Sequence, residues 1–76
     1  MKWKPSKRSD FIKKLRALGF EGAFSGAKHQ FMVFNQCRLT IPSNSEYSVP
    51  QLRMMLREVE EIIERKVSVE EWDGLP

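Results

Sequence analysis

Residues 28–41 read KHQFMVFNQCRLTI and contain two runs rich in bulky side chains. The first run, from Lys28 to Phe34, is typical of a β-strand, and Asn35-Gln36 follows it as a turn signal. The second run has the alternation of a half-buried strand, with Cys37, Leu39 and Ile41 on one side and Arg38 and Thr40 on the other. The short turn predicts that these two strands pair in antiparallel fashion.

A third strand is predicted before this pair. Over residues 20–24, Phe20, Gly22 and Phe24 alternate with Glu21 and Ala23, and Ser25-Gly26 then gives a turn signal. Because only short turns separate the three strands, we expect a three-stranded antiparallel meander. Pro42 ends the last strand, and residues 42–47 are expected to form a polar loop.

A helix is predicted on each side of these strands. The first runs to about Leu18, with Ser6 as its N-cap and Gly19 as the left-handed residue after its end. The second begins at Ser48, which forms a capping box with Gln51. Its apolar stripe has helical spacing and consists of Leu52, Met55, Leu56, Val59, Ile62 and Ile63.

The order helix, three strands, helix predicts an α+β fold. We expect an α-β-β-β-α two-layer sandwich in which both helices cover one face of the meander. The 76 residues are expected to form one domain, 1–76, with a core over about 6–63 and a short helical turn over 68–74. A chain of this size buries little volume, so we expect a surface site and no enclosed cofactor.

Basic residues gather in the first part of the chain. Residues 1–28 hold eight basic and two acidic residues, a net charge of 8 − 2 = +6. Residues 29–76 hold five basic and eight acidic residues, a net charge of 5 − 8 = −3. A cationic half suits a polyanion such as nucleic acid, and a solvated lysine-rich face is the alternative.

The cysteine content and the lengths of the apolar runs predict in which cellular compartment the protein is found. A single cysteine, Cys37, can form neither an intramolecular disulfide nor a structural zinc site by itself, which fits a reducing cytoplasm. The apolar runs are shorter than a membrane span, and the basic residues 1–5 precede no apolar stretch. We therefore expect a cytoplasmic protein without a membrane segment or secretory signal, monomeric when free.

His29 is the single histidine and the candidate for proton transfer near neutral pH. It follows the small residues 25–27, so a substrate backbone could approach closely, and Lys28 and Arg38 could meet a phosphate. Cleavage of an RNA strand needs a base for the 2′-hydroxyl, an acid for the leaving oxygen and cations for the developing charge. His29 and Lys28 could supply part of this, and a structural histidine on a strand is the alternative.

The remaining reactive side chains predict no second site. One histidine, one cysteine and acids at helical spacing do not match a metal site, so we expect no metal. Cys37 alternates with Leu39 and Ile41 and is expected in the core. Tyr47 could stack on a base, but packing on the sheet is the simpler expectation.

Four segments between about Ser6 and Ile63 resemble the HicA family of toxins. They are Leu18-Gly19-Phe20, Gly26-Ala27-Lys28-His29-Gln30-Phe31-Met32, Leu39-Thr40-Ile41-Pro42 and Ser48-Val49-Pro50-Gln51-Leu52-Arg53. The first segment is common among proteins, whereas the central Gly–His–Phe segment followed by the Ile-Pro strand end is more specific.

The resemblance implies a fold like that of double-stranded-RNA-binding domains. It also implies the toxin of a toxin–antitoxin system, a metal-independent endoribonuclease that cleaves messenger RNA and inhibits translation. A HicB-type antitoxin is then the expected protein partner and covers the active site. Carried onto this chain, the catalytic role falls on His29. We expect RNA to be bound by Gly26, Lys28 and Arg38 and by the N-terminal Lys4, Lys7 and Arg8.

The chain departs from the family at the histidine. The familiar form is Gly-Ser-His, whereas Lys28 holds the third position here and His29 comes one residue later. In a regular strand His29 would share a face with Phe31 and Val33, and Lys28 would share the other with Gln30 and Met32. Either the strand is irregular near Gly26, or His29 is partly buried and the protein binds RNA without cutting it.

Three functions therefore stay open from the sequence. The first is the endoribonuclease that the resemblance implies. The second is a binding module that grips RNA through backbone and 2′-hydroxyl contacts without cleavage. The third is a partner-binding protein that uses the helix Leu52–Ile63 as its contact surface.

Overall fold

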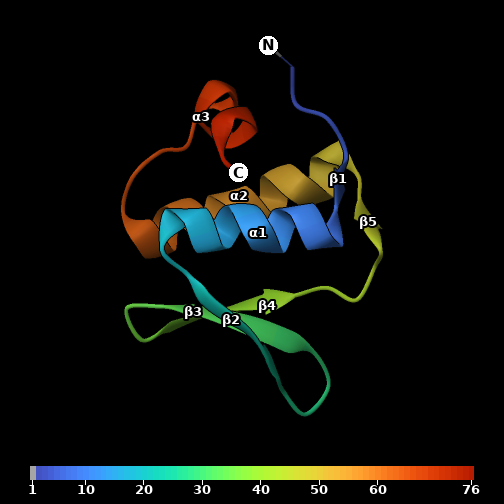
Figure 1. Ribbon diagram of the computed structural model, residues 1–76, viewed down its shortest axis with the longest axis vertical. Coiled ribbons are helices and arrows are strands. Elements are labelled where there is room, and N and C mark those ends of the chain that lie inside the picture. Colours follow the sequence, from blue (N-terminus) through green and yellow to red (C-terminus); the bar gives the residue numbers. More distant parts are fainter. Residues whose placement is uncertain (1) are drawn as a thin grey trace.

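Three antiparallel strands form the lower layer of the computed structural model, which describes residues 2–76 (Figure 1). They are β2 (Glu21–Ser25), β3 (Gln30–Phe34) and β4 (Cys37–Ile41), hydrogen-bonded in the order β2-β3-β4. Helices α1 (Arg8–Leu18) and α2 (Val49–Ile63) lie side by side over one face of this sheet. The predicted α+β class and three-stranded antiparallel sheet are confirmed, and one face of the sheet is left without a helix over it.

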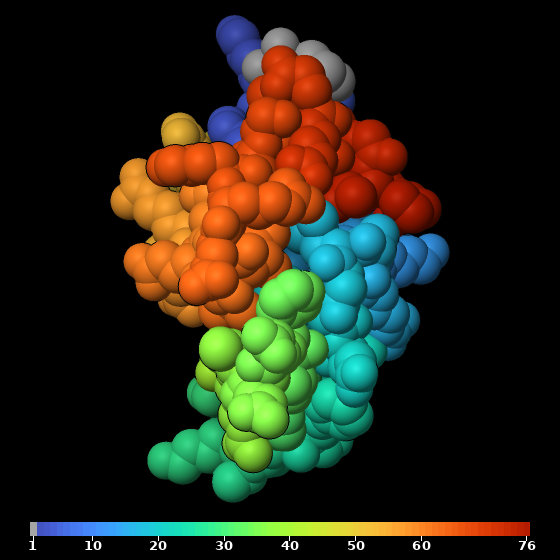
Figure 2. Space-filling view, turned by 90° about the vertical axis from the view of Figure 1, so that its left-hand side faces the viewer, coloured from blue at the N-terminus to red at the C-terminus, as the bar shows by residue number. Residues whose placement is uncertain are grey.

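The two layers are distinct from the side as well. Figure 2 shows the β3–β4 hairpin (green) projecting below α1 (blue to cyan) and the end of α2 (orange). The molecule is elongated, with extents of 37 × 26 × 20 Å. The short helix α3 (Val69–Gly74) lies on the far side of α1 and α2 from the sheet (Figure 1). No helix within residues 2–76 has the length and apolar character needed to cross a membrane.

A second, two-stranded sheet corrects the predicted start of α1. β1 (Ser6–Lys7) pairs antiparallel with β5 (Glu46–Tyr47), so the predicted polar loop 42–47 ends in a strand. Ser6 is therefore not the N-cap; that position is Lys7, and no side chain caps the helix. The prediction was wrong because Ser6 pairs with Tyr47, 41 residues further along the chain, and no local pattern shows such a pairing.

Local signals elsewhere are confirmed. Gly19 ends α1 with a left-handed φ of 110°, and Asn35 and Gln36 both take the positive φ of a tight hairpin turn. The Ser48 side chain accepts a hydrogen bond from the Gln51 amide at the start of α2. Ser68 accepts one from the amide of Glu71 at the start of α3.

A bulge in β2 reverses the predicted side of Phe24. The register pairs Glu21 with Val33 but Phe24 with Phe31, so β2 carries one extra residue between them. Phe20 is consequently buried while Phe24 is exposed on the opposite face, although simple alternation puts both on one face. Gly22 makes this possible, since its φ is 118° and a Cβ there would come within 3.1 Å of the Phe31 carbonyl oxygen.

The core fills the space between the sheet and the helices. Met32, Leu39 and Ile41 face it from the sheet, and Phe11 and Leu15 from α1. The remaining members include Phe20, Tyr47, Leu52, Met55, Leu56, Val59, Val67 and Trp72. Most of the apolar stripe of α2 thus packs inside the molecule, with Leu52, Met55, Leu56 and Val59 buried.

Cys37 lies outside the core, contrary to the prediction. It is exposed and carries a free thiol. Its partner across the strands is Phe34, the last pair before the Asn35-Gln36 turn. Alternation puts Cys37 on the core side of β4, but at this end of the sheet it is Phe34 that packs against Phe20, and Cys37 stays exposed.

Candidate active site

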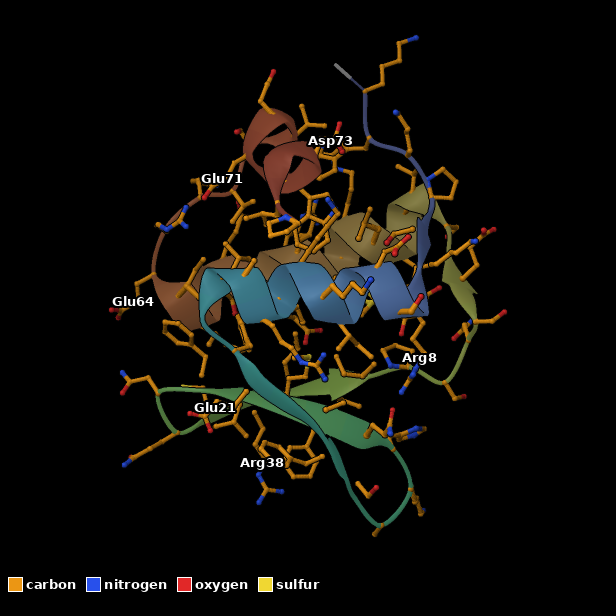
Figure 3. The ribbon with its side chains drawn as sticks, in the orientation of Figure 1. Arg8, Glu21, Arg38, Glu64, Glu71 and Asp73 are labelled. Carbon is orange, nitrogen blue, oxygen red and sulfur yellow. The ribbon has the colours of Figure 1, made fainter. Side chains whose placement is uncertain are left out.

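An open groove lies where the start of α1, the β2–β3 turn and the loop after β4 meet. Its volume is about 550 Å³. The lining residues are Arg8 and Ser9 of α1, Lys28, His29 and Gln30 at the turn, and Ile41, Ser43 and Ser45. Figure 3 shows Arg8 at the beginning of α1, with its side chain extending toward the sheet. Arg8, Lys28 and His29 were all predicted as site residues, and the fold gathers them here.

The β2–β3 turn decides how His29 is presented. β3 begins at Gln30, not at the predicted Lys28, so both Lys28 and His29 belong to the turn and are exposed. The Gly26 amide donates a hydrogen bond to the His29 carbonyl oxygen at 3.1 Å. Of the two alternatives for His29, the structure agrees with an irregular backbone near Gly26. His29 lies outside the strand, so the alternation of side chains does not apply to it, and it is exposed.

Gly26 shapes this turn through its close approach to His29. A Cβ at Gly26 would lie 2.5 Å from the His29 carbonyl oxygen, a separation that side chains do not adopt. Any larger residue would therefore displace the backbone that carries His29. Gly26 was predicted as an RNA contact; its conformation gives it a positioning role through His29.

The groove also contains the N-terminal end of α1. Arg8 and Ser9 are the first two residues of this helix, which has no side-chain cap. The Arg8 amide donates to the Ser45 carbonyl oxygen at 2.9 Å, which ties the loop after β4 to the helix start. The partial positive charge of a helix N-terminus favours anions, and free first-turn amides are ready donors to them.

The charges around the groove have one sign. Arg8 and Lys28 are cationic, and no carboxylate is among the lining residues within the described chain. Ser9, Ser43 and Ser45 add hydroxyl groups that the sequence did not single out as one cluster. No local signal could have found them, because they come from α1 and from a loop more than 30 residues later, joined only by the tertiary fold.

Tyr47 supports the loop that carries two of these serines. Its hydroxyl donates to the Pro42 carbonyl oxygen at 2.7 Å, and its buried ring stands edge-on to Phe11 with centroids 5.5 Å apart. Burial raises the pKa of the Tyr47 phenol, and the nearby positive charge of Arg8 opposes that rise. Tyr47 therefore packs in the core, as the simpler expectation had it.

Three predicted RNA-binding residues lie elsewhere. Lys4 and Lys7 line a separate hollow that also contains Asp10, Glu46 and Asp73, so its charge is mixed. Arg38 lies on the face of the sheet turned away from the helices, as Figure 3 shows. Its guanidinium carbon is 4.5 Å from the centroid of the Phe31 ring.

Within residues 2–76, no three or more His, Cys, Asp or Glu side chains come together in a group that could hold a metal ion. The chain matches no protein-family model, and searches of curated proteins and of solved structures found no match either. The assignment of a function therefore depends on the groove and on the residues that line it.

Proposed function

We propose that this protein is a cytoplasmic endoribonuclease of the HicA toxin type, which cleaves messenger RNA and inhibits translation. The observation that carries the proposal is the groove in which His29, Lys28 and Arg8 meet at the uncapped start of α1. His29 offers a group for proton transfer, and Lys28, Arg8 and the helix N-terminus offer positive charge for the phosphate, which are part of what cleavage at a phosphodiester needs.

The proposed reaction is an attack of the RNA on itself. His29 takes the proton of a 2′-hydroxyl, whose oxygen bonds to the neighbouring phosphorus, and the bond from phosphorus to the 5′-oxygen breaks. The products are a 2′,3′-cyclic phosphate and a 5′-hydroxyl, and we assign the proton of the leaving oxygen to solvent because the groove is open. Lys28, Arg8 and the first amides of α1 stabilise the charge that develops on the phosphate.

The fold is compatible with this proposal. The element order α1-β2-β3-β4-α2 agrees with the α-β-β-β-α order that the resemblance to HicA toxins implies. β1, β5 and α3 are additions to that core. As in a toxin–antitoxin pair, we propose a HicB-type antitoxin as the protein partner that covers the groove.

The alternative is an RNA-binding module without catalysis. The observation in its favour is that His29 is the one residue of the groove lining with an imidazole or carboxyl group, so a second proton-transfer side chain is missing among the described lining residues. The two functions share their phosphate contacts and differ only in strand cleavage.

The experiment that separates them is a cleavage assay in EDTA. Purified protein is incubated with a defined messenger RNA, beside His29→Ala and His29→Gln variants prepared in the same way. We expect cleavage by the parent alone, and fragments that end in a 2′,3′-cyclic phosphate. A substrate with a 2′-deoxy sugar at the cut position is the matched control and should resist. Equal cleavage by parent and variants would exclude His29, and RNA binding without cleavage would favour the alternative.

A further inference from the structure

The face of the sheet that no helix covers carries an aromatic pair. Phe24 of β2 and Phe31 of β3 are directly opposite each other, with ring centroids 5.6 Å apart and an interplanar angle of 41°. Phe24 is 43% exposed, one of two large apolar side chains in the described chain with such exposure. Cross-strand packing accounts for the partly buried Phe31, but it leaves a large part of the Phe24 side chain exposed to solvent.

The exposure of Phe24 is built into the strand. Without the bulge, Phe24 would share the buried side of Phe20. Gly22 permits the bulge. Arg16 donates its Nε–H to the Gly22 carbonyl oxygen at 2.7 Å, which gives this carbonyl group at the bulge a hydrogen-bond partner. Gly22 and Arg16 together thus stabilise a backbone conformation that brings the Phe24 ring to the surface.

The cationic side chain of Arg38 lies beside this aromatic pair, and Phe24, Phe31 and Arg38 together form one surface patch. The guanidinium carbon of Arg38 is 4.5 Å from the centroid of the Phe31 ring, and Arg38 points away from the helices (Figure 3). Within residues 2–76 this guanidinium takes part in no ion pair. Exposed aromatic rings beside arginine are the elements on which proteins stack unpaired bases while holding the phosphates.

The patch is continuous with the groove. The pair Phe24–Phe31 is followed directly by the pair Ser25–Gln30, which closes the turn that carries Lys28 and His29. An RNA strand whose phosphate lies in the groove can therefore place a neighbouring base on Phe24 by passing around this turn. The positive charges of Arg38 and Lys28 favour RNA over an apolar protein surface as the occupant.

We propose that Phe24, Phe31 and Arg38 form a stacking platform for an unpaired base of single-stranded RNA next to the cleavage position. The inference rests on the proposed function and narrows its substrate class. In a duplex both faces of each base are covered by its neighbours, so duplex RNA cannot use the platform. Recognition by stacking is tolerant of base identity, because every base has an aromatic face.

The test measures binding in the His29→Ala background, so that the RNA stays intact. The probe is a short single-stranded RNA with one 2-aminopurine, whose fluorescence falls when the base stacks. We compare Phe24→Ala, Phe24→Leu and Phe24→Tyr, with Met54→Ala as the control for loss of an exposed apolar side chain elsewhere. A thermal unfolding curve for each variant establishes that it is folded.

We expect Phe24→Ala and Phe24→Leu to weaken binding about 10-fold and to abolish the quenching, because stacking needs an aromatic ring. Phe24→Tyr and Met54→Ala should behave as the parent background, and none of the variants should change binding of a duplex of the same sequence. If folded Phe24→Ala binds the single strand as tightly as the background, or if Phe24→Leu preserves both affinity and quenching, the platform is excluded.

The same variants distinguish this inference from the proposed function. Cleavage by the parent with an unchanged KM for Phe24→Ala would overturn the platform and leave the ribonuclease intact. Quenched single-stranded RNA bound by a protein that cleaves nothing would support the platform and overturn the ribonuclease.

Discussion

The amide of Gly26 donates a hydrogen bond to the carbonyl oxygen of His29 across 3.1 Å, and this bond closes the turn between β2 and β3. It explains how His29, which a regular strand would place on the same face as Phe31 and Val33, is exposed at the groove. The strand begins only at Gln30, so the rule that alternates side chains between two faces does not apply to His29.

Gly26→Ala should damage the site through the backbone. A Cβ would stand 2.5 Å from the His29 carbonyl oxygen, so the turn must open. We expect a loss of about 1–3 kcal/mol in the free energy of unfolding, measured by urea titration, and a large loss of RNA cleavage. Gly74→Ala is the matched control, because nothing lies within 4 Å of its added Cβ. Unchanged stability and cleavage in Gly26→Ala would refute the positioning role.

Lys28 should contribute to the salt dependence of RNA binding. Lys28 lines the groove together with Arg8, and each contact between a cationic side chain and a phosphate releases counterions. For single-stranded RNA, the logarithm of the binding constant falls as the logarithm of the salt concentration rises. Lys28→Ala should make this negative slope shallower by about 0.7. Lys66→Ala, on a residue outside the groove, should leave the slope unchanged. Equal slopes for all three proteins would mean that Lys28 makes no phosphate contact.

Tyr47→Phe should loosen the loop after β4. The substitution removes the hydrogen bond from the phenol to the Pro42 carbonyl oxygen, and we expect a loss of about 1 kcal/mol. Burial raises the pKa of Tyr47, so its neutral form is favoured in the folded state. That contribution is complete below about pH 10 and is lost as the pH rises through the raised pKa. Urea titrations at neutral pH and at a pH above about 10 should therefore show a larger loss of the free energy of unfolding in the parent than in Tyr47→Phe. Equal losses in the two proteins would contradict this account.

Lys14→Met should affect stability but not RNA binding. The Lys14 ammonium donates to the carbonyl oxygens of Trp72 (2.7 Å) and Leu75 (3.1 Å), and so holds the end of α3 against α1. Its removal should cost about 1–3 kcal/mol by chemical denaturation. The exposed neighbour Lys13 serves as control, and Lys13→Met should be close to the parent. A weaker RNA affinity in folded Lys14→Met would show that Lys14 is part of the RNA-binding surface after all.

Signals that act within a few residues were sufficient to predict most elements. Gly19, the Asn35-Gln36 turn and the caps at Ser48 and Ser68 each depend on backbone geometry close to the residue itself. The same is true of the apolar spacing in α1 and α2. These features carry the α+β class and the three antiparallel strands, and the structure confirms both.

Two of the errors share a cause, which is long-range pairing. Ser6 is drawn into β1 by Tyr47, and the bulge that exposes Phe24 is defined only by the register of β2 against β3. Cys37 has the alternation of a core residue but is exposed at the last pair before the Asn35-Gln36 turn.

For the candidate site, the sequence by itself determined which side chains could do chemistry: one histidine, with lysines and arginines concentrated in the first 28 residues. The tertiary structure decided which of them meet. It brings Arg8, Lys28 and His29 to one groove, leaves Lys4 and Lys7 at another hollow and turns Arg38 to the opposite face of the sheet. The physical reason is that residue type sets charge and proton affinity, whereas proximity depends on strand register and on the packing of helices against the sheet.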